Sequence, residues 1–240
     1  MKSLLLMVSF FTRIPVHKIE YSEERYIRGI KYVPLIGLLT GGALYAASFA
    51  VSCLDRDVSA IILAAVYILL TGALHIDGMA DTCDGLFSGR DRDRVLEIMR
   101  DSRNGTYGVI SIAFHMVFYV VMFRYIPYEA LIVMPVTGKS ASIVSAYMAN
   151  YVRNEGLGKV FAENCGRREL ASAIIVPVIV SVFTAPEFLI GAALALASSV
   201  GITAWLKKRI GGITGDTMGF VCESAQMVFV FTMYLIGVIQ

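Results

Sequence analysis

Residues 217–239 read TMGFVCESAQMVFVFTMYLIGVI, a run in which Glu223 is the only charged residue. About 20 mostly apolar residues are enough to cross a bilayer as a helix. Similar apolar runs recur along the rest of the chain, which is 57% hydrophobic. We predict seven spans, at about 32–54, 59–76, 107–123, 130–149, 171–185, 188–206 and 217–239. The sequence therefore predicts an all-α, polytopic membrane helical bundle that forms a single domain over residues 1–240.

The distribution of basic residues predicts how this bundle is oriented. Of the 21 Lys and Arg residues, 18 fall before span one or in the loops after spans two, four and six. An excess of Lys and Arg marks cytoplasmic loops. We therefore expect a multi-pass protein of the cell (inner) membrane, with a cytoplasmic N-terminus and an external C-terminus. The N-terminal MKSLLLMVSFF is too short to span the bilayer and lacks a signal-peptide cleavage site, so we expect an interfacial helix there.

The most informative polar feature is HIDGMADTCDG at residues 75–85. Asp77, Asp81 and Asp84 are spaced i, i+4 and i+7, which places three carboxylates on one face of a helix. Three like charges repel one another, and a divalent cation removes that repulsion. Oxygen ligands favour a hard ion such as Mg²⁺, which usually shares its coordination with substrate phosphates. The alternative is a solvated acidic helix start beside the macrodipole.

A second polar cluster, GGITGDTMGFVCESAQ, occupies residues 211–226. Its glycines, among them Gly212 and Gly215, suit a tight loop whose backbone N–H groups can approach an anion. Asp216 and Glu223 are seven residues apart and so share a helix face. An acidic residue inside the bilayer is a functional candidate by default, although Glu223 could instead be hydrogen-bonded within the bundle. We expect the two acidic clusters to converge on one metal site.

Basic side chains near these clusters are candidates for phosphate binding. Arg100 and Arg103 precede a predicted turn, where an arginine can hold a phosphate through two hydrogen bonds. Before them, Val95, Leu96, Ile98 and Met99 predict a short amphipathic cytoplasmic helix that rests on the inner leaflet.

Two further residues carry open alternatives. Lys139 lies deep in span four and needs a carboxylate, a water-filled cavity or a ligand phosphate. His75 is either a general base, a partner of the acidic run, or a hydrogen-bonded structural residue.

Other classes of function receive no support. The four cysteines form no CxxC pair and match no zinc spacing, so we expect reduced thiols. No array of basic and aromatic residues suggests nucleic acid binding.

Three motifs in order carry a resemblance to a known family. HIDGMADTCDGLFSG, then EIMRDSRNGTYGV, then GGITGD resemble the cobalamin synthase family, the adenosylcobinamide-GDP ribazoletransferases. SFFTRIPV near the N-terminus looks like that family's opening, so the resemblance runs from about residue 9 to the C-terminus. Phe220 departs from the small residue often found after TGDxxG. The acidic run also looks like that of the CDP-alcohol phosphotransferases.

The resemblance implies that adenosylcobinamide-GDP and α-ribazole (or its 5′-phosphate) are joined to give adenosylcobalamin (or its 5′-phosphate) and GMP. This is the nucleotide-loop assembly step of cobalamin biosynthesis. We expect the protein to be embedded in the lipid bilayer. We also expect a cavity for the corrinoid between spans two, four and seven. The sequence leaves open whether the bundle forms a homo-oligomer, which form of α-ribazole is used and how many Mg²⁺ ions bind.

The resemblance also implies roles for the residues singled out above. Mg²⁺ would bind the pyrophosphate through Asp77, Asp81 and Asp84, with Asp216 and Glu223 completing its ligands or holding the second substrate. Asp81, Asp84 or His75 would accept the hydroxyl proton. Arg100 and Arg103 would stabilise the transition state, and Lys139, Gly212 and Gly215 would contact substrate.

Two rival functions remain. The first is a CDP-alcohol-type phosphotransferase of phospholipid synthesis, but this chain has Ala80-Asp81 where that family's DGxxAR pattern has Ala-Arg. The second is a membrane transporter, which would place its ionisable groups near the midplane and show inverted repeats. Here the acidic residues gather at one face and no convincing repeat is present.

Overall fold

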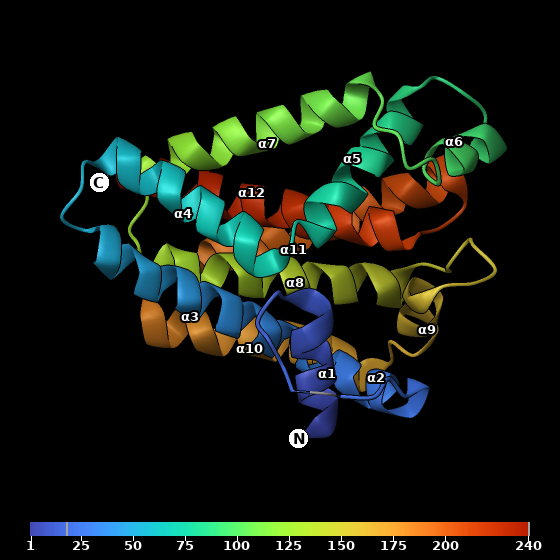
Figure 1. The fold of residues 1–240 in the computed structure, drawn as a ribbon, viewed down its shortest axis with the longest axis horizontal. Coiled ribbons are helices and arrows are strands. Elements are labelled where there is room, and N and C mark those ends of the chain that lie inside the picture. Colours follow the sequence, from blue (N-terminus) through green and yellow to red (C-terminus); the bar gives the residue numbers. More distant parts are fainter. Residues whose placement is uncertain (18, 240) are drawn as a thin grey trace.

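The computed structural model describes residues 1–17 and 19–239, so Lys18 and Gln240 lie outside the described residues. The described chain forms helices and no strand, and seven of the helices run along the long axis of the molecule (Figure 1). They are α3 (Val33–Val51), α4 (Arg56–Thr71), α7 (Thr106–Tyr125), α8 (Ala130–Met148), α10 (Arg167–Thr184), α11 (Phe188–Ile210) and α12 (Gly215–Ile239). Each overlaps one predicted span, which confirms the polytopic helical bundle.

Length and hydropathy allow a membrane crossing for α7, α8, α11, α12 and the segment Glu23–Val51 that contains α3. Helix α8 forms the centre of the bundle, where it packs against α3, α10, α11 and α12. Almost every side chain along it is buried, including that of Lys139. The outer helices instead expose large apolar side chains, such as Phe183 of α10, as expected for a lipid-facing surface.

The predicted second span is wrong at its C-terminal end. Helix α4 stops at Thr71 rather than at residue 76, because Gly72 and Ala73 adopt left-handed backbone conformations with φ of 61° and 58°. The next helix, α5 (Leu74–Phe87), leaves at an angle of 91° to α4. The backbone N–H of Arg13 donates a hydrogen bond to the Leu70 carbonyl and satisfies the end of α4. The acidic run therefore lies on a separate helix that crosses the bundle.

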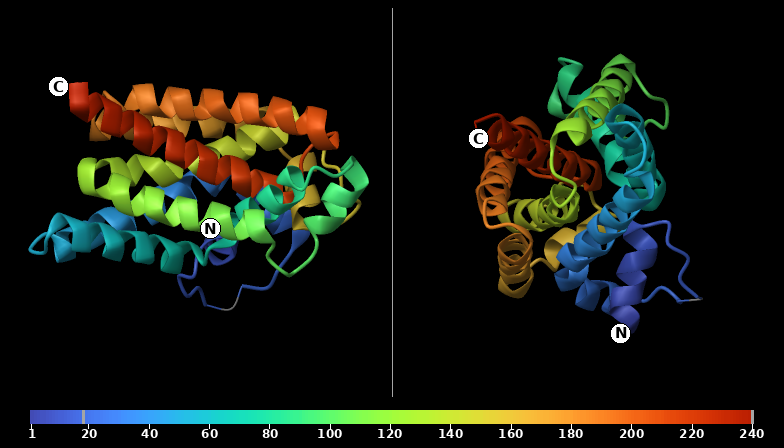
Figure 2. Two further views of the ribbon diagram at one scale, coloured as in Figure 1. Left: turned by 90° about the horizontal axis from the view of Figure 1, so that it is seen from above. Right: turned by 90° about the vertical axis from the view of Figure 1, so that its left-hand side faces the viewer.

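Shorter helices gather toward the same half of the molecule as α5. They are α1 (Lys2–Phe11), α2 (Glu23–Gly29), η1 (Ile30–Tyr32), α6 (Arg92–Ile98) and α9 (Leu157–Glu163). Helices α6 and α9 and the loops around them lie at the end of the bundle opposite the C-terminus (Figures 1 and 2). The predicted N-terminal helix is present as α1, and it packs against α2.

The predicted amphipathic helix is also present, as α6, but its apolar face does not lie free for the inner leaflet. Val95 and Met99 are buried, and both lie against Gly85 of α5. The apolar positions of this segment therefore hold α6 on the acidic helix.

Candidate active site

Two glycines bring the acidic helix α5 into direct backbone contact with the start of α12. A Cβ atom at Gly78 would lie 2.8 Å from the carbonyl oxygen of Asp216, and one at Gly219 would lie 3.0 Å from the carbonyl oxygen of His75. Helices approach this closely only where small residues face each other. The crossing places the carboxylate of Asp81 within electrostatic range of Asp77 and Asp216. The two acidic clusters thus meet, as the sequence predicts, through Asp216.

Asp216 is held by an arginine that the sequence analysis did not single out. Nη2 of Arg153 lies 2.7 Å from Oδ2 of Asp216, and both side chains are largely buried. The loop before α9 pairs with the loop before α12, since Ile213 exchanges backbone hydrogen bonds of 3.0 Å with Asn150 and Val152. This pairing brings Arg153 to the acidic cluster, where it also acts on the charge of Asp81.

Asp84 is turned toward the start of α7. Its two carboxylate oxygens accept hydrogen bonds from the backbone N–H groups of Gly105 and Gly108, at 2.7 and 2.8 Å. Gly105 is the N-cap of α7, where four backbone N–H groups lack partners within the helix and the macrodipole favours an anion. The structure therefore gives Asp84 a capping role, and its predicted roles as metal ligand and proton acceptor stay predictions.

Glu223 lies deep in the bundle among polar partners from other helices. Tyr67 of α4 donates a 2.7 Å hydrogen bond to its carboxylate, Tyr119 of α7 donates one of 3.2 Å, and Nε2 of His115 lies 3.2 Å away. Between described residues, no hydrogen bond or ion pair joins Glu223 to any aspartate. This arrangement matches the alternative of a hydrogen-bonded glutamate inside the bundle.

Lys139 and His75 form a buried pair. Nζ of Lys139 lies 2.8 Å from Nδ1 of His75 and 4.9 Å from the ring centre of Phe11. With Lys139 protonated, Nδ1 accepts the hydrogen bond and the neutral imidazole carries its proton on Nε2. Atoms of His75, Cys222 and Glu223 lie within 4.8 Å of one another, but the lysine ammonium already supplies the positive charge beside them. We therefore do not place a metal ion there.

The other residues predicted to contact substrate lie in different environments. Arg103 is exposed and paired with Asp101, whose pKa its side-chain hydrogen bond lowers to about 2, and Arg100 is exposed. Gly212 packs against the carbonyl oxygen of Asn150. Gly215 lines a cavity, and the nearest atom to a Cβ there is the Tyr151 hydroxyl at 3.9 Å, so this glycine is not needed for close packing.

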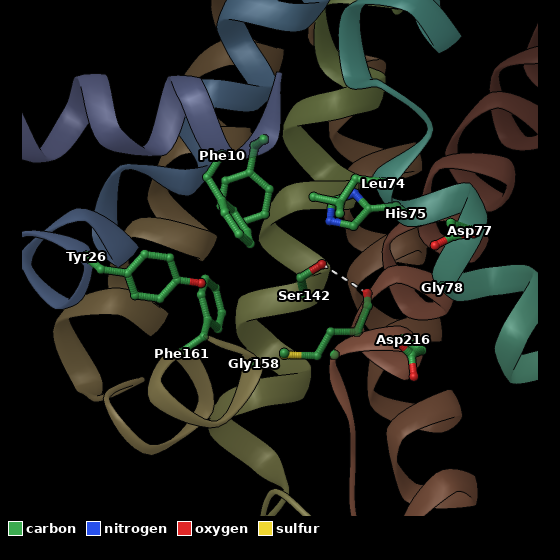
Figure 3. Close-up of a pocket in the computed structure, with 13 residues that line it drawn as sticks. Phe10, Tyr26, Leu74, His75, Asp77, Gly78, Ser142, Gly158, Phe161 and Asp216 are labelled. Carbon is green, nitrogen blue, oxygen red and sulfur yellow. Dashed lines mark hydrogen bonds between the residues drawn. The ribbon is translucent and has the colours of Figure 1, made fainter. Parts of the chain in front are cut away.

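A cavity of about 180 Å³ lies beside the meeting point of α5 and α12. It is bounded by α1, α2, α5, α8, α9 and α12, and the expected corrinoid cavity between spans two, four and seven stays a prediction. Its volume is far below that needed for a corrin macrocycle. His75, Asp77 and Asp216 form one side, and aromatic rings form the other (Figure 3).

The residues at this site fit a divalent cation. Asp77, Asp81 and Asp216 come together with Arg153 as their neighbouring positive charge, and the buried Oδ2 of Asp216 has Arg153 as its ion-pair partner. Three carboxylates with one guanidinium leave excess negative charge, and carboxylate oxygen is the ligand that Mg²⁺ prefers. Asp77, Asp81 and Asp216 are therefore the residues that would bind the cation.

The fold and this site define a polytopic helical membrane protein with an acidic centre and a small cavity near one end of the bundle. The chain belongs to the cobalamin-5-phosphate synthase family, whose sequence profile matches residues 3–234. It is 37% identical to the adenosylcobinamide-GDP ribazoletransferase of Alkaliphilus oremlandii and 40% identical to that of Acetivibrio thermocellus, with 98% of each chain covered in both cases. It is 39% identical to the Clostridium novyi enzyme of the same name, over 97% of this chain and 96% of that one. No solved structure matches the chain.

Neither Arg153 nor the aromatic side of the cavity was predicted as part of the site. Arg153 entered only as one of the basic residues of a cytoplasmic loop, and no local motif marks its pairing with Asp216. Tyr26 and Phe161 occupy short helices whose packing depends on α1 and α8, so their common cavity has no signature in either segment.

Proposed function

We propose that this protein is a magnesium-dependent adenosylcobinamide-GDP ribazoletransferase. The observation that carries the proposal is the convergence of Asp77 and Asp81 of α5 with Asp216 of α12 beside the cavity. The family membership and the names of three relatives support the same reaction. The family that matches is not that of the CDP-alcohol phosphotransferases, and no observation favours a transporter.

In the proposed reaction, a hydroxyl of α-ribazole or its 5′-phosphate attacks the cobinamide-side phosphorus of adenosylcobinamide-GDP. The bond from that phosphorus to the bridging oxygen breaks, and GMP leaves with that oxygen. Asp77, Asp81 and Asp216 would hold Mg²⁺, which would supply charge neutralisation at the pyrophosphate. Arg153 is placed to donate hydrogen bonds to a phosphate oxygen, because its Nε has no partner among described residues.

The hydroxyl proton needs an acceptor at the polar side of the cavity. His75 lines the cavity, but with Lys139 protonated its Nδ1 accepts the lysine hydrogen bond and its proton lies on Nε2, so neither ring nitrogen has a free lone pair. Asp77 also lines the cavity and forms no ion pair within the described chain, whereas Asp216 holds Arg153. We therefore assign the hydroxyl proton to a carboxylate oxygen of Asp77.

We place the protein in the cell (inner) membrane with its N-terminus and the acidic site on the cytoplasmic side. The excess of Lys and Arg in the segments at that end of the bundle supports this orientation. The pyrophosphate of the proposed donor is charged, which fits a site at the aqueous surface.

The test is GMP release by the purified protein in liposomes with adenosylcobinamide-GDP and α-ribazole, with and without Mg²⁺. The proposal expects Mg²⁺-dependent GMP release matched by cobalamin formation. Equal release in the presence of a chelator would remove the metal requirement. No turnover by folded, reconstituted protein would refute the function, and a CDP-alcohol donor would then be the next substrate to try.

A further inference from the structure

The cavity beside the acidic site has an aromatic side that the proposed chemistry does not use. Phe10 and Phe11 of α1, Tyr26 of α2 and Phe161 of α9 supply four rings (Figure 3). Phe10 meets Tyr26 edge-to-face at 5.6 Å, and Phe11 meets Phe161 edge-to-face at 6.4 Å. Because three separate helices contribute these rings, the fold assembles an aromatic wall at this place.

Tyr26 carries a polar group into this apolar surface. The residue is only 2% exposed, yet its hydroxyl forms no hydrogen bond with any described residue. Figure 3 shows the hydroxyl directed toward the ring of Phe161, inside the cavity. Buried tyrosine hydroxyls usually have a hydrogen-bond partner. The Tyr26 hydroxyl is open to the cavity, so a molecule bound there can supply its hydrogen-bond partner.

The size of the cavity limits what that ligand is. An apolar cavity of 150 Å³ in another protein binds benzene, and the cavity here measures about 180 Å³. It therefore accommodates a small planar ring system, with any attached groups extending through its polar side toward Asp77 and Asp216. A corrin macrocycle does not fit.

The proposed substrates carry three aromatic bases: the adenine and the guanine of the donor, and the base of the acceptor nucleoside. Adenine and guanine each present several hydrogen-bond donors and acceptors along their edges, and a buried polar group without a partner is costly. The aromatic side of the cavity offers the single hydroxyl of Tyr26. A benzimidazole, which has one imine nitrogen and otherwise carbon edges, matches that surface.

We infer that this cavity binds the aromatic base of the acceptor nucleoside, with Phe161 against the ring and the Tyr26 hydroxyl donating to its imine nitrogen. The ribose would then extend toward Asp77, where the attacking hydroxyl meets the phosphorus. This inference rests on the proposed function and specifies which substrate occupies the cavity.

The first test removes the Tyr26 hydroxyl while keeping the ring. Tyr26→Phe should raise the KM for α-ribazole roughly two- to tenfold and leave the KM for adenosylcobinamide-GDP unchanged. Equilibrium dialysis of α-ribazole with the purified protein alone should show the same loss of affinity. The matched control is Tyr125→Phe at the far end of α7, where the hydroxyl has no part in the cavity.

An acceptor analogue makes the hydrogen bond itself testable. The indole riboside, with carbon in place of the imine nitrogen, should bind to the wild-type protein more weakly than α-ribazole does. The affinity of this analogue should be the same for Tyr26→Phe as for the wild-type protein. Phe161→Ala should raise the KM for α-ribazole roughly five- to hundredfold through lost stacking. Phe183→Ala, on the exposed face of α10, is its control and should change nothing.

The outcomes separate this inference from the proposed function. Wild-type protein that neither releases GMP nor binds α-ribazole refutes the function and the inference together. Normal GMP release with an unchanged KM for α-ribazole in Tyr26→Phe and Phe161→Ala overturns only the inference. A rise confined to the KM for adenosylcobinamide-GDP also overturns it and assigns the cavity to a purine base of the donor.

Discussion

Nη2 of Arg153 lies 2.7 Å from Oδ2 of Asp216, so a fixed positive charge stands beside the carboxylates that we assign to Mg²⁺. A cation at this position opposes the binding of a second cation, and the repulsion is inversely proportional to their separation and to the local dielectric constant. It also supplies a hydrogen-bond donor for a phosphate. Arg153 therefore affects metal affinity and turnover in opposite directions.

We expect Arg153→Gln to lower the Mg²⁺ concentration for half-maximal GMP release by roughly three- to tenfold, because the competing charge is lost. The same variant should lower kcat, because the phosphate loses a charged donor. Magnesium titrations of GMP release measure both effects. Arg153→Lys keeps the charge and should retain the wild-type magnesium requirement.

The control for charge removal is Arg124→Gln, since Arg124 pairs with Asp57 at the other end of the bundle. It should leave the magnesium requirement and kcat unchanged. An unchanged magnesium requirement in Arg153→Gln would show that Arg153 and the metal do not share a site.

Asp81 is the carboxylate on which the charges of Asp77 and Asp216 both act. Asp81→Asn should lower Mg²⁺-dependent GMP release roughly a hundredfold or more, because a metal ligand is lost at nearly constant volume. Thermal unfolding should stay at the wild-type temperature or rise, since repulsion between like charges is relieved. Near-normal turnover would remove Asp81 from the metal site.

Asp84→Asn should lower the stability of the protein, in contrast to Asp81→Asn. The two oxygens of Asp84 accept the N–H groups of Gly105 and Gly108, and the amide of Asn offers only one acceptor oxygen. We expect Asp84→Asn to lower the free energy of unfolding by about 1–2 kcal/mol, the usual contribution of a helix cap with its charge. Thermal unfolding in detergent, with Asp81→Asn alongside, measures the difference.

Gly108→Ala tests the same contact from the other side, because a Cβ there would collide with the Asp84 carboxylate. It should destabilise the protein about as much as Asp84→Asn. If both variants unfold at the wild-type temperature, the cap contributes nothing to stability.

Apolar length was sufficient to predict the positions of the long helices, although α10 does not qualify as a span and α4 does so only as a bent pair with α5. Helical periodicity was sufficient to predict the helix that carries Asp77 and Asp81. The end of α4 could not be predicted in this way. Gly72 occurs within an apolar run, and Ala73 is a residue that rarely adopts a left-handed conformation. The break also depends on the backbone of Arg13, which reaches α4 from a segment distant in sequence.

The candidate site likewise combines residues that local sequence predicted with contacts that it could not predict. Spacing on a single helix indicated the aspartates of α5, and the approach of Asp216 was expected from its acidic cluster. The partners of Glu223 come from α4 and α7, and the contact of Arg153 depends on two paired loops. Both are tertiary contacts between segments far apart in the chain, for which neither segment carries a local signal.

The crossing of α5 and α12 gives the last prediction. A Cβ at Gly78 would lie 2.8 Å from the carbonyl oxygen and 2.9 Å from Cα of Asp216, so Gly78→Ala must move the two helices apart. Displacement of about 1 Å at a reacting centre can cost two orders of magnitude in rate. We expect Gly78→Ala to lower GMP release about tenfold or more and to raise the Mg²⁺ requirement, because Asp216 moves away from Asp77 and Asp81. The matched control is Gly201→Ala in α11, where no atom lies within 4 Å of the added methyl group, and it should behave as wild type. Wild-type turnover and magnesium dependence in Gly78→Ala would mean that Asp216 does not act together with the carboxylates of α5.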